Sequence, residues 1–287
     1  MQDFTFDAEG VTLSGWVMRP PRRTGPAPVI VLSHGLSAVK AQHIPRFAAA
    51  FAEAGFVCMA YDHRNFGTSG GTPRQEADPW RQVRDMRIAI SHARTLEGVD
   101  PERLGLWGTS YSGGHVLSVA ARDSRVKCVV SQAPITHGYE TLTRSISPEV
   151  MTGLRAWIAQ DADARARGEA PVMVNTFEPG EEGWDCLMAG HETTGYSPQL
   201  TLQSRDMIFS YAPAELIAQI APTPLLMVIA DTDVITPTDL QEQAFAQAGE
   251  PKRLHVIKGA RHFDVYESHF DEASAAARDW FVQHLKP

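Results

Sequence analysis

The sequence predicts an α/β protein in which helices cover both faces of a mostly parallel sheet and a mainly helical segment interrupts the pattern. In the first half of the chain, short apolar runs alternate with stretches of helical periodicity, which is typical of strands joined by helical crossovers. The run 225–230 is apolar throughout, as expected of a strand buried on both faces of a parallel sheet. Between Ile135 and Tyr211 the alternation stops, and the sequence contains no strand run of the parallel type there.

The expected elements follow from this pattern in chain order. Phe4–Phe6 and Val11–Met18 are predicted to form a hairpin around the turn at residues 9–10. In the helix expected at 79–96, apolar residues recur at helical spacing and form a stripe that faces the core. The other strands are predicted at 29–32, 57–61, 103–107, 126–131, 225–230 and 253–257, and the other helices at 45–54, 115–122, 238–248 and 268–285.

The length of 287 residues suits either one large α/β domain with an insertion or two small domains. The break in the pattern favours the insertion. Residues 1–135 and 212–287 are predicted to form the core, and residues 136–211 the inserted segment. Within that segment, helices are expected at 149–167 and 197–209.

Composition and charge argue against several classes of function. The net charge is −8 and no run of Lys or Arg occurs, so nucleic acid is not expected as a partner. The three cysteines are widely spaced, and no Cys-x-x-Cys or His-Glu-x-x-His pattern is present, so we expect reduced thiols and no metal. Without a leader-like N-terminus or an apolar run of membrane-spanning length, the chain is expected to be cytoplasmic and not associated with a membrane.

The stretch 108–114 (Gly-Thr-Ser-Tyr-Ser-Gly-Gly) lies between a predicted strand and a predicted helix. A serine at such a turn is forced outward, and the N–H groups of the helix N-terminus behind it can bind an oxyanion. Ser110 is therefore the candidate nucleophile, and the N–H of Tyr111 a candidate oxyanion donor. Ser112 occupies a position where the pattern Gly-x-Ser-x-Gly has glycine. Taken alone, the motif also fits an ordinary loop.

A serine hydroxyl needs a neighbouring base, and His262 is the candidate because it follows the strand expected at 253–257. The carboxylate that would orient its imidazole is Asp233, just past the end of the strand 225–230, where ligands bind in open parallel sheets. Asp231 competes with Asp233, since two carboxylates two residues apart in an extended loop cannot both face one imidazole.

His34-Gly35-Leu36 directly follows the strand expected at 29–32. The histidine of such a turn is expected to shape the loop, and the N–H of Leu36 is the candidate second oxyanion donor. The other nine histidines, which lie outside such strand-end contexts, are interpreted as packed or surface side chains.

Together these segments resemble the α/β-hydrolase superfamily. The matching stretches are 33–36, 61–69, 108–113, 233–237 and 259–263, and the resemblance extends from about Val11 to Leu285. It implies the α/β-hydrolase fold, the order Ser110, Asp233, His262 along the chain, and a cap formed by residues 136–211 over the nucleophile. Within the superfamily the chain is similar to dienelactone-hydrolase-like and X-Pro-dipeptidyl-peptidase-like esterases and to hydrolase-like polyketide acyltransferases. Ser112 and Arg261 depart from the usual glycines.

The resemblance implies a serine hydrolase that cleaves a carboxylic ester or a related acyl compound through an acyl-enzyme, without a cofactor. The same groups would serve an acyltransferase or a carbon–carbon bond hydrolase of the β-diketone type, and a non-catalytic binding protein of this fold is a third hypothesis. The partner is expected to be a small-molecule substrate; a homodimer is left open. Candidate substrate contacts in the cap are His137, Tyr139 and Trp184. Trp157, Phe177, Tyr196, Phe209 and Tyr211 fit either a substrate contact or the core of the cap.

Overall fold

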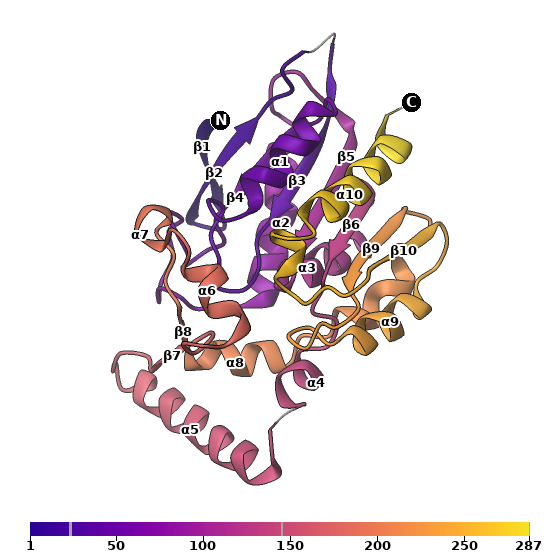
Figure 1. The fold of residues 1–287 in the computed structure, drawn as a ribbon. Helices are drawn as coiled ribbons and strands as arrows, with labels where there is room; N and C mark the ends of the chain where they lie inside the picture. Colours follow the sequence, from indigo (N-terminus) through magenta and orange to yellow (C-terminus); the bar gives the residue numbers. More distant parts are fainter. Residues whose placement is uncertain (23–24, 145, 287) are drawn as a thin grey trace.

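The computed structural model describes residues 1–22, 25–144 and 146–286. In this part of the chain, eight strands form one sheet in the order β1-β2-β4-β3-β5-β6-β9-β10 (Figure 1). β1 pairs with β2 and β2 with β4 in antiparallel fashion, whereas the other neighbours are parallel. The strands are β1 (Gln2–Ala8), β2 (Val11–Met18), β3 (Ala27–Ser33), β4 (Val57–Tyr61), β5 (Val99–Thr109), β6 (Val126–Gln132), β9 (Leu225–Ala230) and β10 (Lys252–Ile257).

Helices cover both faces of this sheet, which confirms the predicted layered architecture. On one face, α1 (Ile44–Glu53) and α10 (Phe270–Leu285) contribute to a core that includes Phe47 and Phe281. On the other face lie α2 (Pro79–Ala93), α3 (Tyr111–Ala120) and α9 (Thr238–Gln247). Every residue of β3, β4 and β9 is buried, and apart from Ser33 at the end of β3 these strands are apolar without alternation, as the sequence pattern predicts.

The helix behind Ser110 begins four residues earlier than predicted. The pair Gly113-Gly114 was interpreted as part of a turn, but both residues are helical in α3. Their role is close packing: a Cβ at Gly113 would lie 2.8 Å from the Cα of Pro134, and one at Gly114 would lie 2.7 Å from the carbonyl oxygen of Ile135. Glycine therefore lets α3 approach the segment that follows β6.

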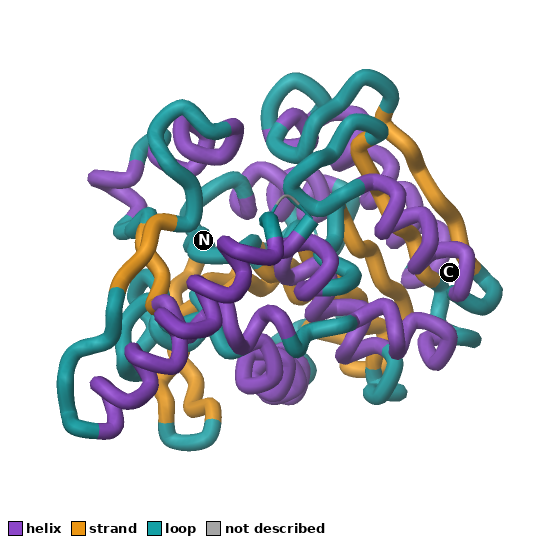
Figure 2. Tube along the Cα trace, turned by 90° about the horizontal axis from the view of Figure 1, so that it is seen from below, coloured by secondary structure: helices purple, strands orange, loops and turns teal. Residues whose placement is uncertain are grey.

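Between β6 and β9 the chain forms a cap at the carboxyl ends of the parallel strands. Figure 1 shows the cap below the sheet, and Figure 2 looks onto that face of the molecule. The predicted helix 149–167 is present as α5, whereas the segment 197–209 divides into β8 and α8. The described cap elements are α4 (Gly138–Thr143), α5 (Pro148–Ala166), β7 (Met173–Asn175), α6 (Glu182–Met188), α7 (His191–Thr194), β8 (Gln199–Thr201) and α8 (Leu202–Phe209).

The short strands β7 and β8, which the sequence did not predict, pair in antiparallel fashion within the cap. Two 3-10 helices, η1 (Pro213–Ile220) and η2 (Asp264–Tyr266), complete the described elements. None of the helices in the described ranges is both long enough and apolar enough to cross a membrane.

Candidate active site

Ser110 lies at the end of β5, at the N-cap of α3, with a strained backbone (φ 56°, ψ −118°). A positive φ at a residue with a side chain costs on the order of 1–3 kcal/mol and persists only where the surroundings enforce it. Here the N–H of Ser110 donates to the Gln132 carbonyl at 2.8 Å, and its carbonyl accepts from the N–H groups of Gly113 and Ile135, each at 3.0 Å. These bonds hold the turn so that the hydroxyl faces the cavity described below.

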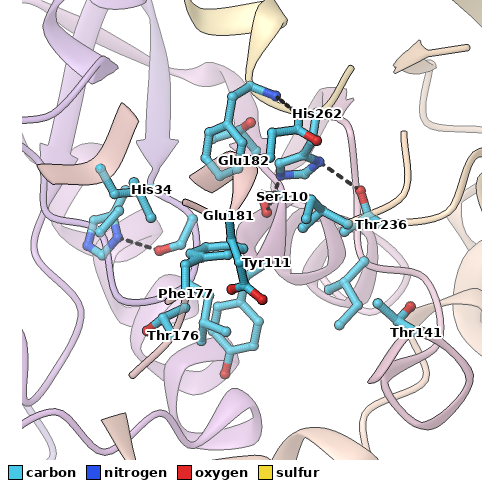
Figure 3. Close-up of a pocket in the computed structure, with 18 of the residues that line it drawn as sticks. His34, Ser110, Tyr111, Thr141, Thr176, Phe177, Glu181, Glu182, Thr236 and His262 are labelled. Atoms are coloured by element: carbon cyan, nitrogen blue, oxygen red, sulfur yellow. Dashed lines mark hydrogen bonds between the residues drawn. The ribbon is translucent and has the colours of Figure 1, made fainter. Parts of the chain in front are cut away.

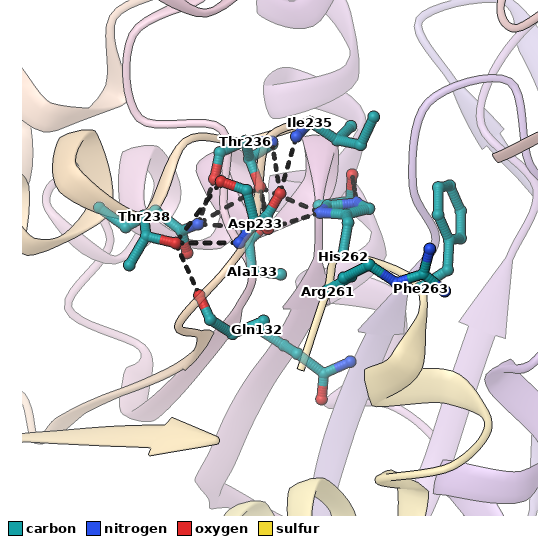
Figure 4. A network of polar contacts seen from close by, with 12 residues as sticks. Gln132, Ala133, Asp233, Ile235, Thr236, Thr238, Arg261, His262 and Phe263 are labelled. Carbon is teal, nitrogen blue, oxygen red and sulfur yellow. Dashed lines mark hydrogen bonds and ion pairs between the residues drawn. The ribbon is translucent and has the colours of Figure 1, made fainter. Parts of the chain in front are cut away.

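His262 links Ser110 to Asp233 through its two ring nitrogens. Its Nε2 lies 3.0 Å from Ser110 Oγ, and its Nδ1 lies 2.7 Å from Asp233 Oδ2 (Figures 3 and 4). Both His262 and Asp233 are buried. The two side chains come from the loops after β10 and β9, which are adjacent strands of the sheet. This geometry allows His262 to take the proton of Ser110 while Asp233 holds the ring in one tautomer.

Asp233 is held as a carboxylate by the loop in which it lies. Its Oδ1 accepts from the N–H groups of Ile235 and Thr236, each at 2.9 Å, and its Oδ2 accepts from the Thr236 hydroxyl at 2.9 Å. Burial alone would raise the pKa of Asp233, but the neighbouring His262 and these hydrogen bonds lower it below its ordinary value. The carboxylate therefore remains ionised at neutral pH, and a charge at this position can stabilise an imidazolium at His262.

The structure separates Asp233 from its competitor Asp231. Asp231 Oδ1 accepts from the N–H of Gly259 at 2.7 Å, and its Oδ2 lies 3.8 Å from the ammonium group of Lys258. Asp231 thus holds the loop after β10 at its exposed side, whereas Asp233 faces the imidazole. The strand position alone did not separate them, because both residues follow the same strand, and the resemblance through the stretch 233–237 favoured Asp233.

Thr236 is a polar residue of the site that the sequence analysis did not single out. Besides its bond to Asp233, its hydroxyl oxygen lies 3.1 Å from His262 Nδ1 and 2.9 Å from the Ala133 carbonyl oxygen. It lies within the predicted 233–237 stretch, and its position could have been recognised from the turn that follows the carboxylate. Thr236 therefore ties the Asp233 loop to the segment after β6.

Both predicted oxyanion donors lie close to Ser110. Tyr111 opens α3, where the first N–H groups of a helix have no acceptor within it. Leu36 belongs to the loop after β3, and this loop passes so close that a Cβ at Gly35 would lie 3.3 Å from Ser110 Cβ. Tyr111 and Leu36 both line the cavity that contains Ser110. The arrangement is suited to binding negative charge next to the serine.

The cavity has a volume of about 570 Å³ and lies between the carboxyl ends of the strands and the cap. A cavity of this size can enclose most of a mid-sized ligand. Figure 3 shows Phe177, Glu181 and Glu182 of the cap near Ser110, Tyr111 and His262. The described residues of the cap that line the cavity are Thr141, Leu142, Asn175, Thr176, Phe177, Glu178, Glu181, Glu182, Leu187, Arg205 and Ile208.

The structure does not bring the three predicted cap contacts into this cavity, and the expectation for them is corrected. His137 instead caps α4, where its ring nitrogen accepts from the N–H of Glu140 at 3.4 Å. Tyr139 is 39% exposed and packs against Phe209 at a ring distance of 5.9 Å. Trp184 is half-buried in α6 and absent from the lining. For His137 and Tyr139, nearness in sequence to the sheet edge was misleading, since the orientation of each cap helix decides which side chains face inward.

Other residues of the cavity were missed or not distinguished by sequence reasoning. Among the remaining cap aromatics, Phe177 lines the cavity, and its ring lies 5.6 Å from that of Phe263. His43, interpreted as a packed or surface histidine, also lines it. Glu181 and Arg205 carried no signal in the sequence because charged residues in a loop and on a short helix are most often solvated.

Ser112, the departure from the glycine pattern, has a specific place beside Ser110. Its hydroxyl lies 2.5 Å from the His34 carbonyl oxygen, 2.9 Å from His63 Nε2 and 3.0 Å from Ser33 Oγ. All four residues are buried. The hydroxyl therefore connects the helix behind Ser110 to the loop that contains Leu36. Glycine at this position would leave that loop without the connection.

Replacing Ser112 by alanine is expected to lower kcat about tenfold or more while changing KM little. Without the Ser112 hydroxyl the N–H of Leu36 would be misplaced, and the loss of an oxyanion donor reduces binding of the transition state more than binding of the substrate. Steady-state kinetics on an ester substrate measures this split. Ser131→Ala is the matched control, since it deletes another buried hydroxyl that bonds α3 (Gly113 carbonyl, 2.9 Å) but not the Leu36 loop. Equal losses in both variants, or a change in KM alone, would contradict the role assigned to Ser112.

Three histidines, His34, His63 and His115, are buried together beside the Ser110 turn. The His34 and His63 rings lie 4.3 Å apart, and those of His63 and His115 lie 5.4 Å apart. Burial lowers the pKa of each ring, that of His63 strongly and that of His115 to about 3. All three are therefore neutral in the folded protein at neutral pH.

This cluster predicts acid sensitivity. The unfolded chain binds a proton at each histidine near pH 6.5, whereas the folded protein does not, so stability is fully present above that pH and is lost as pH falls towards the folded pKa. For His115 alone, the free energy of unfolding is expected to be about 2 kcal/mol lower at pH 5 than at pH 7. Urea unfolding at the two pH values measures the loss, and His115→Gln should reduce it. An unchanged pH difference in that variant would contradict the prediction.

The described residues contain no group of three or more His, Cys, Asp or Glu side chains placed to hold a metal ion. The site as it stands consists of a serine, an imidazole and a carboxylate in series, with backbone N–H groups beside the serine and a cavity above it. This arrangement can perform nucleophilic acyl chemistry.

The fold and this site define the class of protein. The family model described as "alpha/beta hydrolase fold" matches residues 28–268, and the chain belongs to this family. It is an enzyme of the α/β-hydrolase class, as the resemblance implied, and its relatives include proteins named a thiohydrolase and an acyltransferase.

Individual relatives match over almost their whole length. The quorum-quenching protein AidA of Acinetobacter baumannii is 31% identical, with 99% of this chain and 95% of AidA covered. A thiohydrolase of Eupenicillium brefeldianum is 30% identical, with 96% and 91% covered. The crystal structure of the α/β hydrolase GrgF from Penicillium sp. sh18 superimposes with a TM-score of 0.87 at 26% identity, covering 99% of this chain and 98% of GrgF. The grgF sequence of Penicillium sp., 28% identical over 96% of this chain and 94% of the relative, is named a polyketide transferase.

Proposed function

We propose that this enzyme is a serine hydrolase that cleaves a small carboxylic ester or thioester through an acyl-enzyme intermediate. The observation that carries the proposal is the unbroken series of contacts from Ser110 Oγ to His262 (3.0 Å) and from His262 to Asp233 (2.7 Å) beside one cavity. The thioester is included because a relative that matches 96% of this chain is named a thiohydrolase.

The reaction follows from the positions of these groups. His262 accepts the proton of Ser110 as Oγ attacks the carbonyl carbon, and the resulting oxyanion accepts hydrogen bonds from the N–H groups of Tyr111 and Leu36. When the intermediate collapses, the imidazolium gives its proton to the leaving alcohol or thiol. Water, activated by His262, then attacks the acyl-enzyme and releases the carboxylic acid. Asp233 remains a carboxylate throughout.

Acyl transfer is the second candidate, because the relative grgF, which matches 96% of this chain, is named a polyketide transferase. In that case an alcohol or amine, rather than water, would attack the acyl-enzyme, and the cap would have to limit the access of water to Ser110. Product analysis with competing alcohol and amine acceptors separates the two reactions. Free acid as the sole product favours hydrolysis.

The test of the proposed function uses p-nitrophenyl esters and acyl thioesters of increasing chain length with the wild-type enzyme. A fluorophosphonate is applied in parallel, and peptide mass spectrometry locates its site of attachment. Turnover together with labelling of Ser110 supports the proposal, and the chain-length profile measures the acyl pocket. Labelling without turnover of any ester or thioester favours the transferase. Neither labelling nor turnover would refute the serine mechanism.

A further inference from the structure

Arg205 is the one Lys or Arg side chain among the described residues that line the active-site cavity. It lies on α8 of the cap, facing the same space as Ser110. Partial burial lowers its pKa, against the opposing effect of the nearby Glu181 and Glu178 carboxylates. A guanidinium nevertheless remains protonated in proteins, so Arg205 brings a positive charge to the cavity wall.

The guanidinium of Arg205 has few partners in the protein. Within the described ranges its hydrogen bond is to the Asn175 carbonyl oxygen, at a long 3.4 Å, and no carboxylate oxygen lies within 4.0 Å of it. A guanidinium carries five N–H donors in a planar fork. Donors that are partly removed from water and lack protein acceptors favour a ligand that brings an oxygen acceptor into the cavity.

Glu181 and Glu178, the two carboxylates that raise the pKa of Arg205, are hydrogen-bonded within their own loop. Glu181 accepts from the N–H of Glu178 at 2.8 Å, and Glu178 accepts from the side-chain amide of Asn175 at 3.1 Å. Glu182, which also lines the cavity, accepts from the N–H of Phe263 at 3.4 Å. The cavity wall therefore carries three carboxylates and one guanidinium. This balance disfavours a ligand with a full negative charge, whereas a neutral oxygen can accept from the guanidinium without repulsion.

We propose that the acyl chain of the substrate carries a neutral oxygen, as a keto or hydroxyl group, at a distance from the carbonyl that Ser110 attacks, and that Arg205 binds this oxygen. The inference rests on the proposed function and adds the class of acyl group to it. Apolar residues of the cavity, among them Leu142, Phe177 and Ile208, would contact the carbon chain between the two oxygens. The enzyme would thus prefer an oxygenated acyl chain to a plain alkyl chain of the same length.

The test compares three p-nitrophenyl esters of equal chain length: the plain octanoate, the same ester with a keto group near its far end, and the ester with a terminal carboxylate. For the wild type, kcat/KM for the keto ester is expected to exceed that for the octanoate about tenfold or more, the effect of one hydrogen bond to a charged group. The carboxylate ester is expected to be the poorest of the three.

Arg205→Met should reduce the keto-to-octanoate ratio of kcat/KM to near one, and Arg205→Lys should restore part of it. Arg155→Met is the matched control, because Arg155 is an exposed cap arginine outside the lining, 3.4 Å from the Tyr139 hydroxyl, and its loss should leave the ratio unchanged.

Three results would overturn the inference. Equal wild-type kcat/KM for the keto ester and the octanoate would refute it while the proposed function stands. Preference for the carboxylate ester would assign Arg205 to an anion. A keto-to-octanoate ratio of kcat/KM that stays at the wild-type value in both Arg205 variants would mean that Arg205 does not bind the oxygen. If Ser110 is not labelled by a fluorophosphonate and none of the esters reacts, the proposed function fails first, and this inference fails with it.

Discussion

Ser110→Ala is expected to lower ester turnover by roughly 10⁴- to 10⁶-fold, because the remaining oxyanion donors and the cavity cannot replace the nucleophile. Among the described contacts, Ser110 Oγ is the one side-chain oxygen of the turn within hydrogen-bonding distance of His262 Nε2. The two atoms lie 3.0 Å apart. The loss should appear in kcat, with the substrate still bound in the cavity. Steady-state and single-turnover kinetics with a p-nitrophenyl ester measure it, and fluorophosphonate labelling should disappear in the variant.

Ser118→Ala is the control for this substitution. Ser118 lies in α3, the helix that begins directly after Ser110. It is buried and its hydroxyl lies 3.2 Å from that of Tyr211, but it does not line the cavity. Its loss should leave turnover within a few-fold of the wild type. Turnover near the wild-type level in Ser110→Ala would rule out the acyl-enzyme mechanism, whatever the behaviour of Ser118→Ala.

Asp233→Asn is expected to lower kcat by about 10⁴-fold, because an amide in place of the carboxylate favours the wrong imidazole tautomer and cannot stabilise an imidazolium. The Oδ2 of Asp233 lies 2.7 Å from His262 Nδ1, and its Oδ1 accepts two backbone N–H groups. An asparagine there can keep some of these contacts, so the fold should survive. Kinetics over a range of pH, with circular dichroism to check folding, measure the effect.

Asp231→Asn provides the matched comparison, since it makes the same chemical change two residues earlier in the same loop. Asp231 bonds the N–H of Gly259 and does not contact His262, so turnover should change only a few-fold. The pair therefore tests the choice of Asp233 over its competitor Asp231. A larger loss in Asp231→Asn than in Asp233→Asn would reverse it and would require the loop after β9 to adopt another conformation.

Ser112 illustrates how the tertiary structure changes the meaning of a motif. In the sequence it is only a departure from the pattern Gly-x-Ser-x-Gly. In the structure its hydroxyl contacts residues 79 and 78 positions earlier in the chain, Ser33 and the carbonyl of His34. No local pattern could have shown this connection, because β3 and β5 become neighbours only when the sheet forms.

The sequence by itself determined the layered architecture and the order of strands and helices along the chain. It also identified Ser110, Asp233 and His262 as the candidate site residues. The physical reason is that apolar runs have a readable period, and polar residues just past parallel strands must meet at one edge of the sheet. Strand position alone did not separate Asp231 from Asp233, because both satisfy that rule. The resemblance favoured Asp233, and the loop conformation decides which of the two faces His262.

Only the tertiary structure decided which cap residues face the cavity. His137, Tyr139 and Trp184 were expected there, whereas Phe177, Glu181 and Arg205 line it. A short helix or loop of the cap has little apolar periodicity of its own, so its rotation is set by where it packs on the core and on its neighbours. The lining of the cavity therefore depends on how the cap segments pack, whereas the positions of Ser110, Asp233 and His262 follow from the ends of the strands.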